Sequence, residues 1–319
     1  IPDNLTVAKS IDPSDNLQSA IDETSSNGGG VILLSAGTYR ITSTIQLKDN
    51  VVLRGVSADQ VIMESVIRSE EIFADKVNTF EFLDVTNAGL EHLTILYKVD
   101  NVEPIDRDGL TDGGWCWQCF VNDPDGVKNL YVRQVLIDNS SSNCWVSDCN
   151  ILKSGDDPIT IKGDHNTVRN SYIDRAYNKG GGGRAYFHIT GDYNLIVNNT
   201  VKRLRHFAIE RGAEYNVVYQ NNIEVDINFH NGDDGNNLIE RNIINIPTWH
   251  SWDAIVTGDP KFRHSPPGEN NIILNNVINN KNENTPYSVP NTIYTLTGFQ
   301  TVTRTTLPAP QCDTFYPVY

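Results

Sequence analysis

An eight-residue phrase that begins with asparagine recurs between residues 166 and 278. Its five copies are Asn166–Ile173, Asn194–Val201, Asn216–Ile223, Asn237–Ile244 and Asn271–Ile278, and a looser copy covers Asn143–Asn150. The five copies start 28, 22, 21 and 34 residues apart. A period in the twenties with insertions of variable length is typical of a solenoid. Apolar and polar residues alternate within each phrase, which indicates β-strands.

Between these phrases lies a second short apolar run that ends in glycine. These runs are Ile159–Gly163, Phe187–Gly191, Phe207–Gly212, Ile227–Gly232 and Ala254–Gly258. One coil would therefore hold two or three short strands, each paired with its copies in neighbouring coils at a spacing of about 4.8 Å. Asparagines at the same corner of successive coils could form a ladder of side-chain hydrogen bonds.

A single coil cannot bury its apolar face, whereas a stack of coils can. We therefore predict an all-β protein that folds as a single-stranded, right-handed parallel β-helix with an N-terminal helical cap. A β-sandwich of antiparallel hairpins is the alternative, but sandwiches do not repeat one phrase in a fixed order.

The 319 residues are predicted to form one domain, because a solenoid grows by adding coils. Residues 1–30 would form the N-terminal cap, with a helix that begins at Ser14 and places Leu17, Ala20 and Ile21 on one face. Residues 31–280 would form the coils. Residues 281–319, which are rich in proline, would form a C-terminal cap.

The net charge of −15 disfavours binding to nucleic acids and to anionic membranes. This charge is unevenly distributed. Residues 160–264 contain 12 Lys and Arg against 12 Asp and Glu, whereas the rest of the chain contains 13 against 28. Six of the seven histidines also lie in this middle part. Chance variation is one explanation; the other, which we favour, is a locally basic groove for an anionic ligand.

The five cysteines are Cys116, Cys119, Cys144, Cys149 and Cys312, an odd number that leaves one thiol unpaired if disulfides form. The pair Cys116 and Cys119 lacks two further zinc ligands at suitable spacing, so no metal site is predicted. No run of eighteen apolar residues is present, so we expect no membrane span. No signal peptide is visible, and the start at Ile1 fits a mature, processed form. We expect a secreted or periplasmic protein that is a monomer.

The chain resembles a known superfamily, and the residues that show this lie in its N-terminal part. A helix, a glycine-rich turn, the run Val31–Arg40 (VILLSAGTYR) and the run Leu47–Val56 (LKDNVVLRGV) are similar to the beginning of pectate-lyase-like right-handed β-helices. That superfamily includes polysaccharide lyases, polygalacturonase-like hydrolases, alginate epimerases and phage tailspikes. The resemblance covers roughly residues 14–280, and it implies the same fold and a polysaccharide partner.

If the large apolar residues of the glycine-ended strands point inward, their neighbours point outward. The outward residues are Lys162, Tyr186, His188, His206, Glu210, Asp226, Asn228 and His230, with Arg211 at the rim. Titratable groups that cluster on one face indicate a functional groove. Trp249 and Trp252, in a polar insertion, are candidate platforms for stacking sugars. We expect Lys162, Arg205, His206 and Arg211 to hold substrate anions.

Hydrolysis of a glycosidic bond requires two carboxylates, and Asp226, Glu210 and Glu224 are the leading candidates, with His188 or His230 assisting. Residues two apart on one strand are separated by about 6.6 Å. Glu224 and Asp226 would therefore suit an inverting enzyme, which needs roughly 6.5–9.5 Å, if both lie on one strand. Glu210 and Asp226, on adjacent coils, are the other candidate pair.

A second acidic segment, Ser154–Lys162 (SGDDPITIK), resembles the G-D-D-x-x-x-I-K segment of polygalacturonases, which are inverting hydrolases. That resemblance implies that Asp156 and Asp157 are paired catalytic acids. The polygalacturonase motifs G-H-G and R-x-K are absent here, as is a clear third aspartate. Gly155-Asp156-Asp157 is also compatible with a simple turn.

Elimination from a uronic acid is the competing chemistry, and it needs a base together with a cation or metal that neutralises the substrate carboxylate. Lys162 and Arg211 resemble the Lys and Arg of β-helix lyases that cleave alginate and chondroitin, although one coil separates them here. Such a lyase could use Ca²⁺; otherwise no cofactor is expected. A glycan-binding β-helix without catalysis is a third hypothesis.

From the sequence we predict an endo-acting glycoside hydrolase that cleaves an anionic polysaccharide, uronic or sulfated, in a groove on the side of the helix. Elimination is the alternative. Ultraviolet absorbance during digestion separates the two, because only elimination leaves a conjugated double bond.

Overall fold

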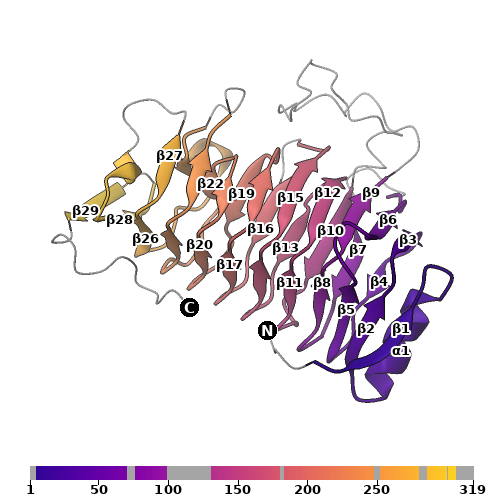
Figure 1. Ribbon diagram of the computed structural model, residues 1–319. Coiled ribbons are helices and arrows are strands. Elements are labelled where there is room, and N and C mark those ends of the chain that lie inside the picture. Colours follow the sequence, from indigo (N-terminus) through magenta and orange to yellow (C-terminus); the bar gives the residue numbers. More distant parts are fainter. Residues whose placement is uncertain are drawn as a thin grey trace.

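The computed structural model describes residues 5–69, 76–98, 131–179, 183–247, 252–279, 286–299 and 301–306. The chain forms a right-handed parallel β-helix whose coils stack along one axis (Figure 1). Each coil contributes one strand to each of three sheets, so strands three apart in the chain are neighbours. The predicted fold class is confirmed.

Within the described part of the chain, the three sheets contain 12, 9 and 8 strands. The 12-stranded sheet is β1 (Val7–Ile11), β2 (Gly30–Leu34), β5 (Val51–Gly55), β8 (Gly89–Glu91), β11 (Trp145–Ser147), β14 (Thr167–Arg169), β17 (Leu195–Val197), β20 (Val217–Tyr219), β23 (Leu238–Glu240), β26 (Asn271–Leu274), β28 (Thr292–Thr297) and β29 (Thr301–Thr306). The 9-stranded sheet is β3 (Gly37–Ile41), β6 (Val61–Ser65), β9 (Thr94–Tyr97), β12 (Asn150–Ser154), β15 (Tyr172–Ala176), β18 (Thr200–Lys202), β21 (Asn222–Ile223), β24 (Ile243–Asn245) and β27 (Val277–Asn279).

The 8-stranded sheet is β4 (Ile45–Gln46), β7 (Val77–Phe82), β10 (Val132–Ile137), β13 (Ile159–Ile161), β16 (Tyr186–Ile189), β19 (His206–Ile209), β22 (Ile227–Phe229) and β25 (Ile255–Thr257). The described residues after β25 include two short 3₁₀ helices, η1 (Pro260–Phe262) and η2 (Pro286–Ser288). The glycine-ended runs of the sequence supply the later strands of this sheet.

Each repeated phrase is a strand of the 12-stranded sheet, a sharp bend, and a strand of the 9-stranded sheet. In the first copy, β14 and β15 are separated by Asn170 and Ser171, and Asn170 has the left-handed backbone conformation (φ 52°). A second left-handed residue, His165, lies five positions earlier, where the coil enters the 12-stranded sheet. The residue after each bend is usually asparagine, which accounts for the two asparagines in most copies.

These asparagines form two hydrogen-bonded ladders, where the sequence predicted one. In the first ladder, Asn194 accepts from the backbone N–H of Asn166 at 2.8 Å, and Asn216 accepts from that of Asn194 at 2.9 Å. Asn221 and Asn242 belong to the second ladder and accept in the same way at the other bend. Buried backbone N–H groups at the bends are therefore satisfied by the next coil.

A third row of side chains lines the first bend on its outer surface. The rings of His165, Tyr193 and Tyr215 stack on one another with centroids 5.0 Å apart. All three residues have left-handed backbone conformations, which cost side-chain-bearing residues roughly 1–2 kcal/mol each. Stacking between neighbouring coils offsets part of that cost.

The apolar core fills the interior of the coils. As predicted, the inward positions of β13, β16, β19 and β22 belong to this core: Ile159, Ile161, Phe187, Ile189, Phe207, Ile209, Ile227 and Phe229. The rings of Phe187 and Phe207 stack with their centroids 4.6 Å apart. The cysteines Cys144 and Cys149 are buried free thiols at the bends of one coil, and the other three cysteines lie outside the described residues.

Helix α1 (Leu17–Ser26) covers the N-terminal end and packs against β1 and β2. Its predicted start was two residues early, because Asn16 rather than Ser14 accepts the hydrogen bond from the backbone of Ser19. At the other end, β28 pairs antiparallel with β26. No helix in the described ranges is long and apolar enough to cross a membrane.

We expect Asn216→Ala to lower the free energy of unfolding by about 2–4 kcal/mol, measured from urea unfolding curves. The fully buried amide accepts from Asn194 N–H and donates to the carbonyl of Gly191 and to Asn237 Oδ1. Alanine leaves these groups without partners. The control is Asn279→Ala, which removes an exposed amide that bonds Asn245 and should cost no more than about 0.5 kcal/mol. Equal effects would contradict the importance of the buried ladder.

Candidate functional site

The candidate site lies on the outer side of the 8-stranded sheet, where β13, β16, β19 and β22 are neighbours. Register places Tyr186 beside His206, and it places Thr160, His188, Ala208 and Asn228 in one row across the four strands. Most of the residues predicted to face outward do gather here. They are not exposed, however: Tyr186, His188, His206, Glu210, Asp226 and Asn228 are each at most 8% exposed.

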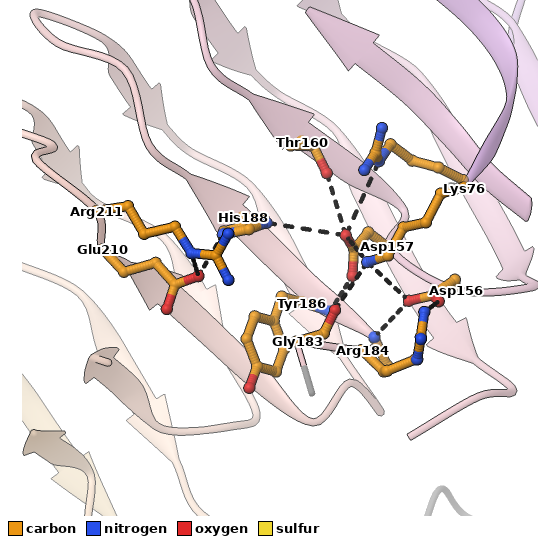
Figure 2. Close-up of polar contacts among 12 residues, drawn as sticks. Lys76, Asp156, Asp157, Thr160, Gly183, Arg184, Tyr186, His188, Glu210 and Arg211 are labelled. Carbon is orange, nitrogen blue, oxygen red and sulfur yellow. Dashed lines mark hydrogen bonds and ion pairs between the residues drawn. The ribbon is translucent and has the colours of Figure 1, made fainter. Parts of the chain in front are cut away.

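Glu210 lies at the centre of the site, between two histidines. Its Oε1 is 2.8 Å from His188 Nε2, and its Oε2 is 2.7 Å from His230 Nδ1. His230 Nε2 is in turn 3.2 Å from the hydroxyl of Tyr186. The guanidinium of Arg211 reaches Glu210 Oε1 at 3.0 Å (Figure 2).

Burial alone would raise the pKa of Glu210, but hydrogen bonds from His188 and His230 hold it well below the ordinary value. Glu210 is therefore a carboxylate at neutral pH. Burial alone would lower the pKa of His188, but the carboxylates of Asp157 and Glu210 raise it above the ordinary value. Burial raises the pKa of the Tyr186 phenol, so this side chain is neutral and can donate a hydrogen bond.

The Gly-Asp-Asp segment forms a buried ionic cluster next to Glu210 and His188 (Figure 2). Asp156 and Asp157 are completely buried. Lys76 lies between them, with Nζ 3.2 Å from Asp156 and 2.5 Å from Asp157. Arg184 pairs with Asp156 at 3.1 Å, and Arg133 Nε is 3.8 Å from Asp157.

The two aspartates differ in acidity because their surroundings differ. Burial raises the pKa of Asp156, and the neighbouring charge of Asp157 adds to this effect while Lys76 opposes it. Burial would also raise the pKa of Asp157, but Lys76 and His188 hold it well below the ordinary value.

The cations of this cluster were not foreseen from the sequence. Lys76 precedes β7, two coils before Asp157, and Arg133 is the second residue of β10 in the coil between them. Arg184 directly follows a run of four glycines in the sequence. No local pattern marks any of the three residues, since each is defined by a partner in another coil.

A second histidine–carboxylate pair lies one coil further on. Nδ1 of His206 is 2.8 Å from both oxygens of Asp226, and Asn228 donates to Asp226 at 3.1 Å. Trp252 packs against the imidazole with ring centroids 4.7 Å apart. Burial lowers the pKa of His206 to about 4, although Asp226 opposes the shift, so the ring is neutral at pH 7.

Glu224 does not share a strand with Asp226, so the proposed inverting pair of these two residues is wrong. Glu224 follows β21 in the 9-stranded sheet, where it pairs with Lys202 at 2.7 Å. The buried Val225 then directs the chain across a corner before β22. The sequence alternation continued through this corner although the strand did not.

The cations that reach solvent are at the edge of the site. The side chain of Arg211 is 61% exposed and that of Lys162 is 42% exposed, the latter 3.2 Å from Asp138. Arg205 lies over the rings of Tyr186 and Trp252, at 5.8 and 5.9 Å from their centroids. The predicted platform residue Trp249 lies outside the described residues.

No group of three or more His, Cys, Asp or Glu side chains in the described ranges is arranged to hold a metal ion.

A protein-family model described as "Rhamnogalacturonase A/epimerase, pectate lyase-like" matches residues 9–237. This match agrees with the resemblance seen in the sequence, and it covers the cap helix and the coils that carry His188 and Glu210.

Two curated relatives are mannuronan C5-epimerases AlgE1 and AlgE3 of Azotobacter vinelandii, each 28% identical over 129 residues. The match covers 38% of this chain but only 9% and 7% of those relatives. Among solved structures, the Dettilon tailspike protein gp208 is similar with a TM-score of 0.53 and 13% identity, covering 78% of this chain and 46% of that one. This likeness confirms the fold.

Acidification should destabilise the protein through His206. Its pKa is about 4 in the folded protein and 6.5 in the unfolded chain, so the unfolded chain binds the proton first. The stability contributed by the neutral ring is present above pH 6.5 and is lost as pH falls, by about 3 kcal/mol at pH 4.

Thermal unfolding of wild type and His206→Asn across this range measures the effect. Asparagine keeps a donor for Asp226 but does not titrate, so this variant should lose less stability on acidification. His165→Asn, which changes an exposed imidazole, should retain the pH dependence of wild type. The same dependence in all three proteins would refute the assignment to His206.

Proposed function

Because the chain belongs to the rhamnogalacturonase A/epimerase, pectate lyase-like family, we propose that it removes the proton from carbon 5 of a uronate residue in an anionic polysaccharide. The observation that carries this proposal is the hydrogen-bonded chain Tyr186–His230–Glu210. Such a chain suits proton transfer, and it lies beside exposed cations.

The ionised Glu210 determines the role of Nδ1 of His230 in their hydrogen bond. A carboxylate only accepts hydrogen bonds, so Nδ1 of His230 carries the hydrogen that it shares with Glu210, and in the neutral ring Nε2 presents a lone pair. That lone pair faces the hydroxyl of Tyr186 at 3.2 Å. The arrangement follows the logic of catalytic triads, in which a carboxylate orients a histidine that accepts a proton from a hydroxyl. Tyr186 and His230 are thus a matched pair for general acid–base catalysis.

Removal of the proton next to a carboxylate leaves an electron pair on carbon 5, and cations near the carboxylate stabilise it. Arg211 is an exposed cation next to Glu210. Lys162, which directly follows β13, is another exposed cation at the edge of the site. Tyr186 gives its hydroxyl proton to His230 and takes the proton from carbon 5. The electron pair on carbon 5 can then form a double bond to carbon 4 and expel the glycosidic oxygen, which takes up a proton from this pair. Alternatively, a proton returns to carbon 5 from the opposite face and inverts it.

Two further considerations favour chemistry at carbon 5. The Azotobacter relatives are named as C5-epimerases of mannuronan. In addition, the carboxylates that a hydrolase would use are buried and paired: Asp226 with His206, and Glu210 with two histidines. The side chains of His230 and Arg211 are more exposed than these carboxylates.

Hydrolysis is the second candidate, on one observation. The pKa of Asp156 is raised and that of Asp157 is lowered, which is the asymmetry that an acid and a base of a glycosidase require. Against this, each carboxylate is held in an ion pair, Asp156 with Arg184 and Asp157 with Lys76, whereas the side chains of His230 and Arg211 reach solvent.

The substrate test uses polymannuronate, polyguluronate and polygalacturonate, each with and without added Ca²⁺ and each in deuterium oxide. Elimination would raise ultraviolet absorbance as the chain is cut. Epimerisation would incorporate deuterium at carbon 5 without cutting the chain. New reducing ends without either signal would favour hydrolysis and reject the proposal, as would the absence of reaction on every uronate polymer.

We expect Tyr186→Phe and His230→Gln each to reduce kcat by about 10²–10⁴-fold, because each removes one partner of the proton transfer. Tyr193→Phe is the matched control, since it deletes the hydroxyl of an exposed tyrosine outside the site. Near-normal kcat in both site variants would eliminate this pair as the catalytic acid and base.

A further inference from the structure

The Gly-Asp-Asp segment contacts the backbone at the start of β16, the strand that carries Tyr186 and His188. Oδ1 of Asp156 accepts from the N–H of Ala185 at 3.0 Å, and Oδ1 of Asp157 accepts from that of Tyr186 at 2.9 Å. Lys76 adds a further contact by donating to the carbonyl of Gly183 at 2.8 Å. Figure 2 shows Asp157 and Lys76 beside Tyr186 and Gly183, at and just before the start of β16.

The other oxygen of Asp157 is directed toward His188. Oδ2 accepts from Lys76 Nζ at 2.5 Å and from the hydroxyl of Thr160 at 3.2 Å, and it lies 3.8 Å from His188 Nδ1. Among the described residues, His188 Nδ1 has no hydrogen-bond partner, and this nitrogen is shielded from solvent. The opposite nitrogen is already bonded to Glu210. His188 is therefore enclosed between two carboxylates and has no ring nitrogen available to a substrate.

We propose that Asp157 is a positioning residue, which acts through His188 to hold Glu210 and thereby the proton-accepting nitrogen of His230. This inference rests on the function proposed above for His230. The order is a continuous chain: Asp157 faces His188, His188 bonds Glu210, and Glu210 bonds His230. Asp157 itself is completely buried.

The charged groups around His188 come from several strands. Their arrangement, with carboxylates beside His188 and cations behind the carboxylates, supports the positioning role of Asp157. Asp157 precedes β13, Glu210 follows β19, and His230 follows β22. Lys76 and Arg133 surround Asp157 from the preceding coils, and Arg211 contacts Oε1 of Glu210, the oxygen that His188 also bonds. When it is protonated, His188 lies between the carboxylates of Asp157 and Glu210 and adds to the compensation that Lys76, Arg133 and Arg211 already provide. Loss of the charge on His188 would weaken the hold on Glu210.

The deciding variant is Asp157→Asn, with Asp156→Asn as its matched control. The carboxamide oxygen can still accept from the N–H of Tyr186, so the start of β16 is retained while the negative charge near His188 is lost. The control removes the adjacent charge but keeps the acceptor for Ala185. Asp156 contacts Lys76 and Arg184 rather than His188.

The first measurement is the titration of the His188 ring by NMR, which requires no substrate. We expect the midpoint to fall by about one pH unit or more in Asp157→Asn and to change much less in Asp156→Asn. Equal shifts in the two variants would overturn the inference. Because this result does not depend on activity, it separates failure of the inference from failure of the proposed function.

The second measurement is kcat and KM as a function of pH on whichever uronate polymer reacts. Asp157→Asn should lower kcat about tenfold or more, leave KM within about twofold, and move the alkaline limb of the profile to lower pH. A rise in KM alone would mean that Asp157 contacts substrate and would refute the positioning role. His188→Gln, which keeps a donor for Glu210 without the charge, should reduce kcat in the same way if Asp157→Asn does not fold.

Discussion

Hydrogen bonds from buried asparagine side chains to the backbone of the neighbouring coil are the interaction on which the rest of this structure depends. Each coil makes two sharp bends, and each bend exposes backbone N–H groups that the strands do not use. Asn216 and Asn221 satisfy these groups in the coil before their own, and their amides bond the coil after it. Because a buried N–H without a partner is costly, every coil must stack in one register.

That fixed register is what assembles the candidate site. His188 and Glu210 are 22 residues apart and Glu210 and His230 are 20 apart, yet both pairs are in hydrogen-bond contact. A shift of one residue in either strand would turn these side chains into the core and the phenylalanines outward. The polar side of the sheet is therefore as dependent on the ladders as the core is. Its charges are placed before any substrate arrives, which is the condition for electrostatic preorganisation.

The site also contains several buried charges, whose removal from water is unfavourable. Asp156, Asp157, Glu210 and Asp226 are all shielded from solvent, and each has a cationic or imidazole partner within 3.2 Å. Removing one partner of such a pair leaves an uncompensated charge and is strongly destabilising. We therefore regard the cluster as a rigid support for the more exposed groups His230 and Arg211, rather than as a row of independent carboxylates.

The sequence alone determined the fold and the two faces of its strands. A solenoid repeats one local pattern, and both the Asn phrase and the period-2 alternation can be recognised within a single coil. The sequence correctly gathered His188, Glu210, Asp226 and His230 on one side. It could not show that most of them are covered, that Glu224 lies around a corner, or that Lys76 pairs with an aspartate 81 residues away. Those facts were decided only by the tertiary structure, because burial and ion pairing depend on which coils and insertions meet in space, and no periodicity along the chain records that.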